Sequence, residues 1–183
     1  TADEAGLVCG ADWEIPVVLD HSFYTWNRQA LSFLKKALGS RLFYTTLPLE
    51  LNRKELADRG CEGSELVVYG HAPLMVTAGC IKKTENICDH REGLVYMTDR
   101  KRKRFPVKTL CKSCCNIIYN GEPLYLLDQM EEVTALNPAS VRMEFTIESW
   151  QCQRALTQIL RSGWQNRPTD AALTRGHFRR GVD

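Results

Sequence analysis

Short apolar runs alternate with helical patterns along most of the chain, and this alternation constrains the fold more than any other feature. The β-branched runs Gly6–Cys9 and Pro16–Asp20 are typical of buried strands, and Trp26–Leu38 then carries leucines at helical spacing and stops at Gly39. The alternation continues through Arg41–Thr46 (strand), Leu51–Arg59 (helix), Glu65–Gly70 (strand), Pro123–Asp128 (strand), Gln129–Leu136 (helix), Val141–Thr146 (strand) and Ile147–Arg161 (helix). The pattern predicts an α/β fold in which βαβ units surround a parallel sheet.

The strand–helix units recur about every 25 residues, which is the rhythm of a (β/α) barrel. A full barrel needs eight units and about 250 residues, whereas we count five parallel strands. We therefore expect residues 1–162 to be the C-terminal part of a TIM-barrel-like fold, with a self-contained open sheet as the alternative. The N-terminal sequence TADEAGLVCG has no initiator Met and reads as the middle of a longer chain, which would supply the missing N-terminal barrel units. Residues 163–183 read as a basic tail or linker that leaves the domain.

Composition excludes some classes of protein but does not identify a function. The net charge of +2 is nearly balanced, so nucleic-acid affinity would have to come from a local patch. No apolar run reaches the roughly 18 residues of a membrane span, and no secretion signal is visible, so we expect a cytoplasmic protein and no membrane contact. The eight cysteines are clustered rather than spread in pairs, which favours a metal role in a reducing compartment over disulfides.

Five of the eight cysteines lie between Cys80 and Cys115, in an insertion at residues 80–122. The insertion follows the strand Glu65–Gly70, and Leu94–Met97 and Phe105–Val107 flank a polar turn as the two arms of a hairpin. Cys111 and Cys114 form the one C-x₂-C knuckle, whereas a zinc ribbon normally has two. The irregular spacing of the others suits an iron–sulfur cluster held from separate loops. Spacing alone leaves an iron–sulfur cluster, zinc and no metal open.

Two kinds of polar residue are candidates for function. Arg100, Lys101, Arg102, Lys103 and Arg104 form a basic run at the predicted hairpin tip, which is either a solvated turn or a phosphate-binding patch. Polar residues also stand where the predicted strands end. We expect four of them, Glu50, Asn52, Arg142 and Glu144, to line a concave catalytic site.

Several ordered motifs resemble the peptidase U32 family, the "collagenase-like" proteins. They are LPLELN (Leu47–Asn52), VVYGHAPLMVTAGC (Val67–Cys80), the Asp99–Arg100 and Phe105–Val107 frame of the hairpin, CNIIYNGEPLYLLD (Cys115–Asp128) and TRGHFRRGV (Thr174–Val182). The resemblance extends from about Pro16 to Phe145.

This resemblance implies a TIM-barrel-like core and a 4Fe–4S cluster held by four cysteines. Cys80, Cys88 and Cys114 stand at positions that match the family's ligands. Many relatives have another cysteine soon after the one that matches Cys88, and Asp89–Glu92 provides none. Cys111 is our choice for the fourth ligand and Cys115 the second choice, with zinc as the alternative metal.

The resemblance also implies a function. Better-understood members of the family act in the hydroxylation of tRNA or ribosomal RNA bases, or of the ubiquinone ring. We therefore expect an iron–sulfur protein that acts in hydroxylation of an RNA base, with RNA as the partner of the basic run. A collagenase-like peptidase and a metal-stapled scaffold without catalysis are the alternatives.

Overall fold

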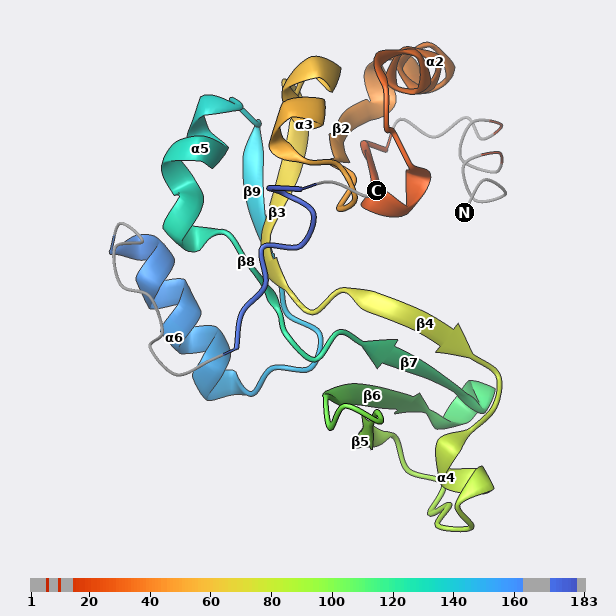
Figure 1. Ribbon diagram of the computed structural model, residues 1–183. Helices are drawn as coiled ribbons and strands as arrows, with labels where there is room; N and C mark the ends of the chain where they lie inside the picture. Colours follow the sequence, from red (N-terminus) through yellow and green to blue (C-terminus); the bar gives the residue numbers. More distant parts are fainter. Residues whose placement is uncertain (1–5, 7–9, 11–14, 163–171, 181–183) are drawn as a thin grey trace. The chain divides into compact units, whose positions relative to one another are not determined.

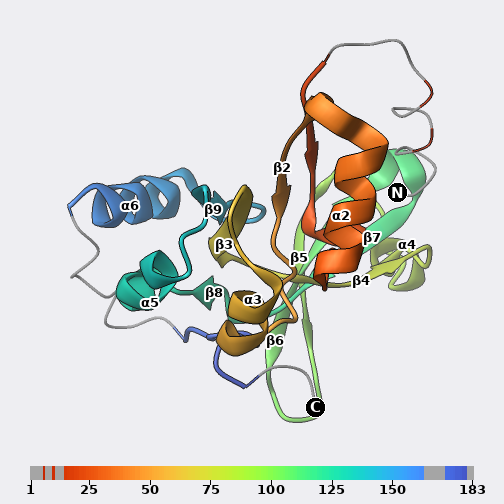
Figure 2. The same cartoon turned by 90° about the horizontal axis from the view of Figure 1, so that it is seen from above.

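The computed structural model describes residues 6, 10, 15–162 and 172–180 of the protein (Figures 1 and 2). The chain forms two compact units, and each is discontinuous in sequence. Unit 1 comprises Thr1–Val68, Leu126–Met143 and Arg175–Asp183, and unit 2 comprises Tyr69–Tyr125 and Glu144–Thr174. The strand predicted at Gly6–Cys9 lies outside the described residues except for Gly6.

Unit 1 contains the parallel part of the fold. Strands β1 (Val17–Leu19), β2 (Leu42–Thr46) and β3 (Ser64–Gly70) pair in parallel, and β9 (Ser140–Glu144) also pairs with β3. Helix α2 (Arg28–Leu38) connects β1 to β2, α3 (Arg53–Arg59) connects β2 to β3, and α5 (Met130–Ala135) precedes β9. These elements confirm the predicted βαβ alternation and a mixed α/β fold.

Local sequence signals account for where these helices begin and end. Asn27 caps α2 by accepting a hydrogen bond from the Ala30 amide at 2.8 Å, and Gly39 ends the helix with a φ of 57°. The core of unit 1 then forms from the apolar faces of helices and strands. Its most deeply buried side chains include Leu47, Leu56, Val68, Leu127 and Val133.

Unit 2 contains a four-stranded antiparallel sheet in the order β4-β7-β6-β5. Its strands are β4 (Pro73–Thr77), β5 (Gly93–Thr98), β6 (Arg104–Leu110) and β7 (Cys115–Tyr119), with the single-turn helix α4 (Ile81–Thr84) between β4 and β5. The predicted hairpin is confirmed as β5 and β6, which pair from Gly93↔Thr109 to Thr98↔Arg104. Helix α6 (Trp150–Arg161) also belongs to unit 2 and starts after the cap Ser149, three residues later than predicted.

The predicted parallel strand Pro123–Asp128 is wrong. Only β8 (Leu124–Tyr125) is a strand, and it pairs antiparallel with the last two residues of β3. The reason is that the β4–β7 ladder continues into β3 and β8, with Pro73 opposite Tyr119 and Gly70 opposite Leu124. A strand that returns along such a ladder, without a crossover helix, must run antiparallel. The described strands therefore form one mixed sheet and one antiparallel sheet, and a barrel is not confirmed.

The described part of the C-terminal segment, 172–180, differs from the expected departing tail. Phe178 is buried and its carbonyl accepts a hydrogen bond from the Arg53 amide at 2.8 Å. Arg175 pairs with Asp128, and Arg179 donates to the Gln129 side chain. Residues 175–180 thus pack into unit 1, because an aromatic residue and two arginines of this segment find partners there. The remainder of the predicted tail lies outside the described residues.

Candidate functional site

The strand register of unit 2 brings five cysteines to one end of its four-stranded sheet. At this end β4 finishes with Thr77 opposite Asn116 of β7, and β6 finishes with Leu110 opposite Cys115. β5 starts there too, with Gly93 opposite Thr109. The β4–β5 connection carries Cys80 and Cys88, the β6–β7 connection carries Cys111 and Cys114, and Cys115 is the first residue of β7. We call this end of the sheet the cysteine end; in Figure 1 it is the end that carries α4.

The thiols at the cysteine end are free, and the loops that carry them are shaped by their own backbone bonds. The Cys80 carbonyl accepts from the Lys83 and Thr84 amides at 3.1 and 3.0 Å, so Cys80 starts α4. Cys114 has a φ of 49° and its Sγ lies 3.7 Å from the Cys111 carbonyl oxygen. Cys88 and Cys114 are exposed, whereas Cys80, Cys111 and Cys115 are partly buried.

Lys82 fastens the loop that carries Cys88. Its Nζ donates to Asp89 Oδ1 at 2.8 Å and to the Arg91 carbonyl at 2.9 Å. The hydrogen bond with Asp89 raises the pKa of Lys82 against the opposing effect of burial, and the nearby Cys111 and Cys88 raise it further. The same bond, helped by the Arg91 amide, lowers the pKa of Asp89 to about 2. The pair is therefore charged at neutral pH.

The Asn116 side chain holds the residue that precedes Cys80 through a hydrogen bond. It is fully buried, and its Nδ2 donates to the Gly79 carbonyl at 2.6 Å. Its Oδ1 is buried with no hydrogen-bond partner among the described residues. The residue before Cys80 and the residue after Cys115 are thus joined directly, which links the β4–β5 connection to strand β7.

The donors at the cysteine end fit a metal by their chemistry. Thiolates are the ligands that zinc and iron–sulfur clusters take, and here they come from the β4–β5 and β6–β7 connections and from the start of β7. The orphaned Oδ1 of Asn116, next to the Gly79–Cys80 approach, is a further polar group without a protein partner. No group of three histidine, cysteine, aspartate or glutamate side chains in the described part of the chain lies close enough to hold an ion. The loops must therefore close further for four thiols to ligate one centre.

The basic run lies at the opposite end of the same sheet from the cysteines. It forms the turn between β5 and β6, and the seven residues of β6 separate the two ends by about 20 Å. The alternating antiparallel strands impose this separation. Asp99 shapes the turn by accepting from the Lys101 and Lys103 amides, each at 2.8 Å.

The five basic side chains of this turn divide into two groups. Lys103 Nζ lies 3.3 Å from Glu122 Oε1, and the Arg104 guanidinium lies over the Tyr96 ring at 4.3 Å from its centroid. Arg100, Lys101 and Arg102 are exposed and have no ion-pair partner within the described ranges. Of the five basic residues, these three are therefore the exposed cations without an ion-pair partner in the described part of the chain.

The four residues expected to form a catalytic site have different local surroundings. Asn52 caps α3, accepting from the Lys54 and Glu55 amides, so its side chain has a structural role. Arg142 and Glu144 both lie on β9, and Glu144 packs against Gly70. Glu50 has one buried carboxylate oxygen, Oε2, with no hydrogen-bond partner in the described part of the chain.

Arg142 instead joins a polar cluster in unit 1. Its Nη2 donates to Asp20 Oδ1 at 2.7 Å, and its Nε lies 3.6 Å from Glu65 Oε1. Thr46 also donates to Glu65 Oε1 at 3.2 Å. Burial alone would raise the pKa of Asp20, but the bonds from Arg142 and from the His21 amide outweigh it and lower that pKa. The expectation that polar strand ends converge is met here by Asp20 and Arg142, which are far apart in sequence.

Unit 2 contains a second polar cluster that sequence reasoning did not assemble. The Glu148 side chain is 2% exposed, and its Oε2 accepts from the Thr146 and Ile147 amides at 2.7 and 3.0 Å. Its Oε1 lies 4.0 Å from His71 Nε2, while His71 Nδ1 is 2.6 Å from the Asn120 carbonyl. Burial, followed by the charge of Glu148, raises the pKa of Tyr69. The position of His71 directly after a predicted strand was a signal that the sequence offered for this cluster. No feature of the sequence around Glu148 indicates that Glu148 lies beside His71.

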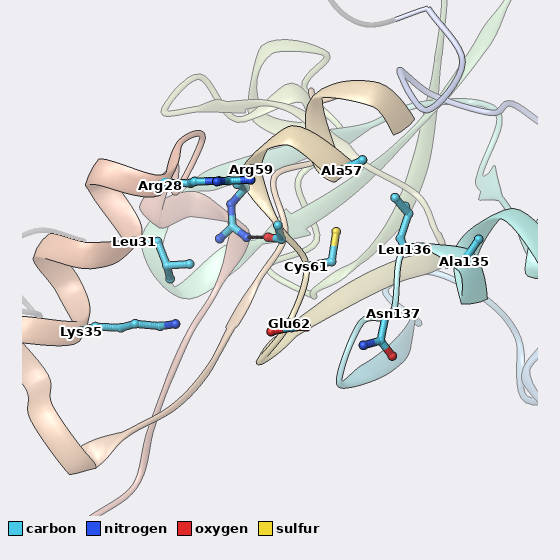
Figure 3. Close-up of a pocket in the computed structure, with 11 residues that line it drawn as sticks. Arg28, Leu31, Lys35, Ala57, Arg59, Cys61, Glu62, Ala135, Leu136 and Asn137 are labelled. Atoms are coloured by element: carbon cyan, nitrogen blue, oxygen red, sulfur yellow. Dashed lines mark hydrogen bonds between the residues drawn. The ribbon is translucent and has the colours of Figure 1, made fainter.

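A cavity of about 490 Å³ lies in unit 1, between α2, the end of α3 and the end of α5. Figure 3 shows Arg28, Leu31 and Lys35 of α2 on one side, and Arg59 and Cys61 deeper in the cavity. Arg59 is 4% exposed and donates to the Gly60 carbonyl at 2.7 Å. Burial raises the pKa of the Cys61 thiol, although the charge of Arg59 opposes this.

Comparisons of the chain with protein-family models, with curated proteins and with solved structures found no match. A separate survey of the helices found none, within the described ranges, with both the length and the apolar character that a bilayer crossing requires. The functional interpretation therefore depends on the residues themselves.

Proposed function

We propose that the protein binds a 4Fe–4S cluster at the cysteine end and acts in the hydroxylation of an RNA base, as its resemblance to the peptidase U32 family implies. The observation that carries this proposal is the presence of five free cysteines, from two connections and the start of β7, at one end of a sheet. Cys80, Cys88, Cys111 and Cys114 are the proposed ligands, and Cys115 is the reserve for Cys111. When bound, such a cluster supplies electron transfer or substrate activation.

The role of the chain's own residues is to bind and orient. The Lys82–Asp89 contact and the Asn116–Gly79 bond set the positions from which the cysteine loops close. Of these ligands Cys88 and Cys114 are exposed, whereas Cys80 and Cys111 are partly buried.

Metal analysis of protein purified without oxygen tests the cluster. About four iron atoms per chain and a brown colour are expected for a 4Fe–4S centre. Serine variants of Cys80, Cys88, Cys111 and Cys114 should each lose iron, whereas Cys152→Ser, an exposed cysteine of α6, should retain it. Stoichiometric zinc without iron would refute the cluster and leave a thiolate zinc site. No bound metal in wild-type protein would refute both.

RNA binding is proposed for the three exposed cations of the β5–β6 turn, Arg100, Lys101 and Arg102. Each phosphate contact to single-stranded RNA contributes about 0.7 to the slope of log K against log salt, so a triple glutamine variant should reduce that slope by about 2. The measurement is fluorescence anisotropy with a labelled single-stranded RNA over a salt series. A triple glutamine variant of Arg28, Lys35 and Lys36 on α2 removes the same charge elsewhere and is the control. An equal reduction of the salt slope in both variants would show that RNA binding is not specific to the turn.

We also propose that the parallel strands of unit 1 belong to a TIM-barrel-like fold of a cytoplasmic protein. Parallel sheets are ordinarily covered on both faces, yet Val18 of β1 is 44% exposed and Phe43 of β2 is 68% exposed. Further β/α units of the same protein would cover this apolar surface. The proposal predicts that the amides of β1 and β2 exchange hydrogen more slowly in a protein extended by such units than in the present chain. Unchanged exchange rates would contradict it.

A further inference from the structure

Lys82 is enclosed by three parts of the cysteine end. Its side chain is 10% exposed, although it lies on a helix of a single turn. The ammonium contacts Asp89 and Arg91 in the loop after α4, and a Cβ placed on Gly93 at the start of β5 would lie 3.8 Å from Nζ. Lys82 therefore connects α4, the Cys88 loop and the first residue of β5.

This burial is unusual for a lysine and requires compensation. An ammonium withdrawn from water must be paired and hydrogen-bonded, and Asp89 and the Arg91 carbonyl satisfy two of its three N–H donors. Lys83, the next residue on the same turn, is exposed, so the single-turn helix does not by itself require its lysines to be buried. Of these two adjacent lysines, Lys82 points inward, and the contacts of the loop must offset the free-energy cost of burying its charge.

The two contacts of the Lys82 ammonium lie just after Cys88 in the chain, at Asp89 and Arg91. Asp89 is the direct neighbour of Cys88, and Asp89 Oδ1 also accepts from the Arg91 amide at 3.2 Å. On the other side of Cys88, the Ile87 amide donates to the Lys82 carbonyl at 2.9 Å, a bond that does not involve the lysine side chain. The Lys82 ammonium thus holds the residue that follows the exposed Cys88, while the backbone of α4 holds the residue that precedes it.

We propose that Lys82 is a positioning residue for the metal site, acting through Asp89 to hold Cys88 within reach of the other thiols. The inference rests on the proposed function, because Lys82 can position a metal ligand only if the cysteine end binds a metal. Its fixed positive charge beside Cys88 and Cys111 also offsets part of the negative charge that several thiolates gather at one place. Polar residues that orient metal ligands typically contribute 10- to 100-fold to metal affinity.

The test is a metal competition titration on the full chain, with Co²⁺ as the probe because its thiolate complexes are coloured. Lys82→Met keeps the aliphatic stem and removes the donors, and Asp89→Asn weakens the same contact from the exposed partner. Both variants should bind Co²⁺ about 10- to 100-fold more weakly than wild type, whereas the matched control Lys83→Met should bind as wild type does. Wild-type affinity in either Lys82→Met or Asp89→Asn would overturn the proposal.

Two further measurements separate the possible failures. Circular dichroism of the metal-free variants checks folding, and if Lys82→Met does not fold, Asp89→Asn alone decides the outcome. Cys88→Ser reports on the site itself. If wild type and Cys88→Ser bind Co²⁺ equally, the proposed metal site is refuted together with the role of Lys82. If Cys88→Ser binds weakly and Lys82→Met normally, only the role of Lys82 is refuted.

Discussion

Replacing Arg59 should destabilise unit 1 more than any surface substitution. The guanidinium is buried at the end of α3, and its acceptors are all uncharged: the Thr25 carbonyl and hydroxyl, the Gly60 carbonyl, and the hydroxyls of Ser64 and Thr45. The side chain therefore ties the segment before α2 to strands β2 and β3. No carboxylate shares this role among the described residues.

The magnitude follows from the bonds that are lost. Arg59→Met retains much of the aliphatic stem but removes all five N–H donors. A buried acceptor left without its donor costs about 1–3 kcal/mol, and the Thr25 and Gly60 carbonyls both lose theirs. Removing a buried charge recovers part of its desolvation cost, so we expect a net loss of about 3–5 kcal/mol in the free energy of unfolding. This is a large fraction of the 5–15 kcal/mol that is typical of a folded domain.

Urea unfolding followed by circular dichroism at the helical minimum measures this loss. Arg28→Met is the matched control, because Arg28 lines the same cavity but is exposed, and its substitution should change the free energy of unfolding by less than about 0.5 kcal/mol. A loss below about 1 kcal/mol for Arg59→Met would refute the reasoning, since it would mean that the acceptors find other partners.

Three other substitutions test separate features. Gly121→Ala should destabilise unit 2 by about 1–3 kcal/mol in thermal unfolding, because its Cβ would overlap the Arg104 carbonyl oxygen; a neutral effect would show that the two segments separate easily. Asn52→Ala should cost about 1 kcal/mol in urea unfolding through loss of the α3 cap, and no change would leave its side chain available for catalysis. Asp20→Asn should lose about 0.5–1 kcal/mol at pH 6, because the lowered pKa of Asp20 means that its ionised form stabilises the fold beside Arg142. That contribution is present above the unfolded pKa near 4 and is lost as pH falls through the lower pKa of the folded state, so the difference between wild type and Asp20→Asn should shrink in acid, and a constant difference would contradict the assignment.

Local signals in the sequence were sufficient for the helices and strands of the parallel part and for the β5–β6 hairpin, but not for β4, α4 and β7. The leucine spacing before Gly39 predicted α2, and the β-prone runs around the basic turn predicted the β5–β6 hairpin. Periodicity and punctuation by glycine act over a few residues, so they can be recognised without a structure. The direction of β8 could not be recognised in this way, because it depends on the long ladder formed by β3–β4 and β7–β8.

The candidate site was predictable in composition but not in arrangement. The cluster of cysteines was visible in the sequence, yet only the register shows that the basic turn lies at the other end of the sheet. The inward turn of Lys82 beside the outward Lys83 has no signature in the sequence, because both are ordinary lysines of a short helix. The pairing of Arg142 with Asp20 likewise depends on contacts between residues that are distant in the chain.

The discontinuity of the two units has a consequence for how the chain acquires its structure. The chain passes between the units four times, after Val68, Tyr125, Met143 and Thr174. Neither unit is complete until residues near the C-terminus have been added, so a ribosome-bound N-terminal fragment cannot finish either one. Contacts between such distant segments also slow folding, because long loops must close before the contacts form. The metal that we propose would thus meet Cys80–Cys115 early during synthesis, before the segments that complete unit 2 are available.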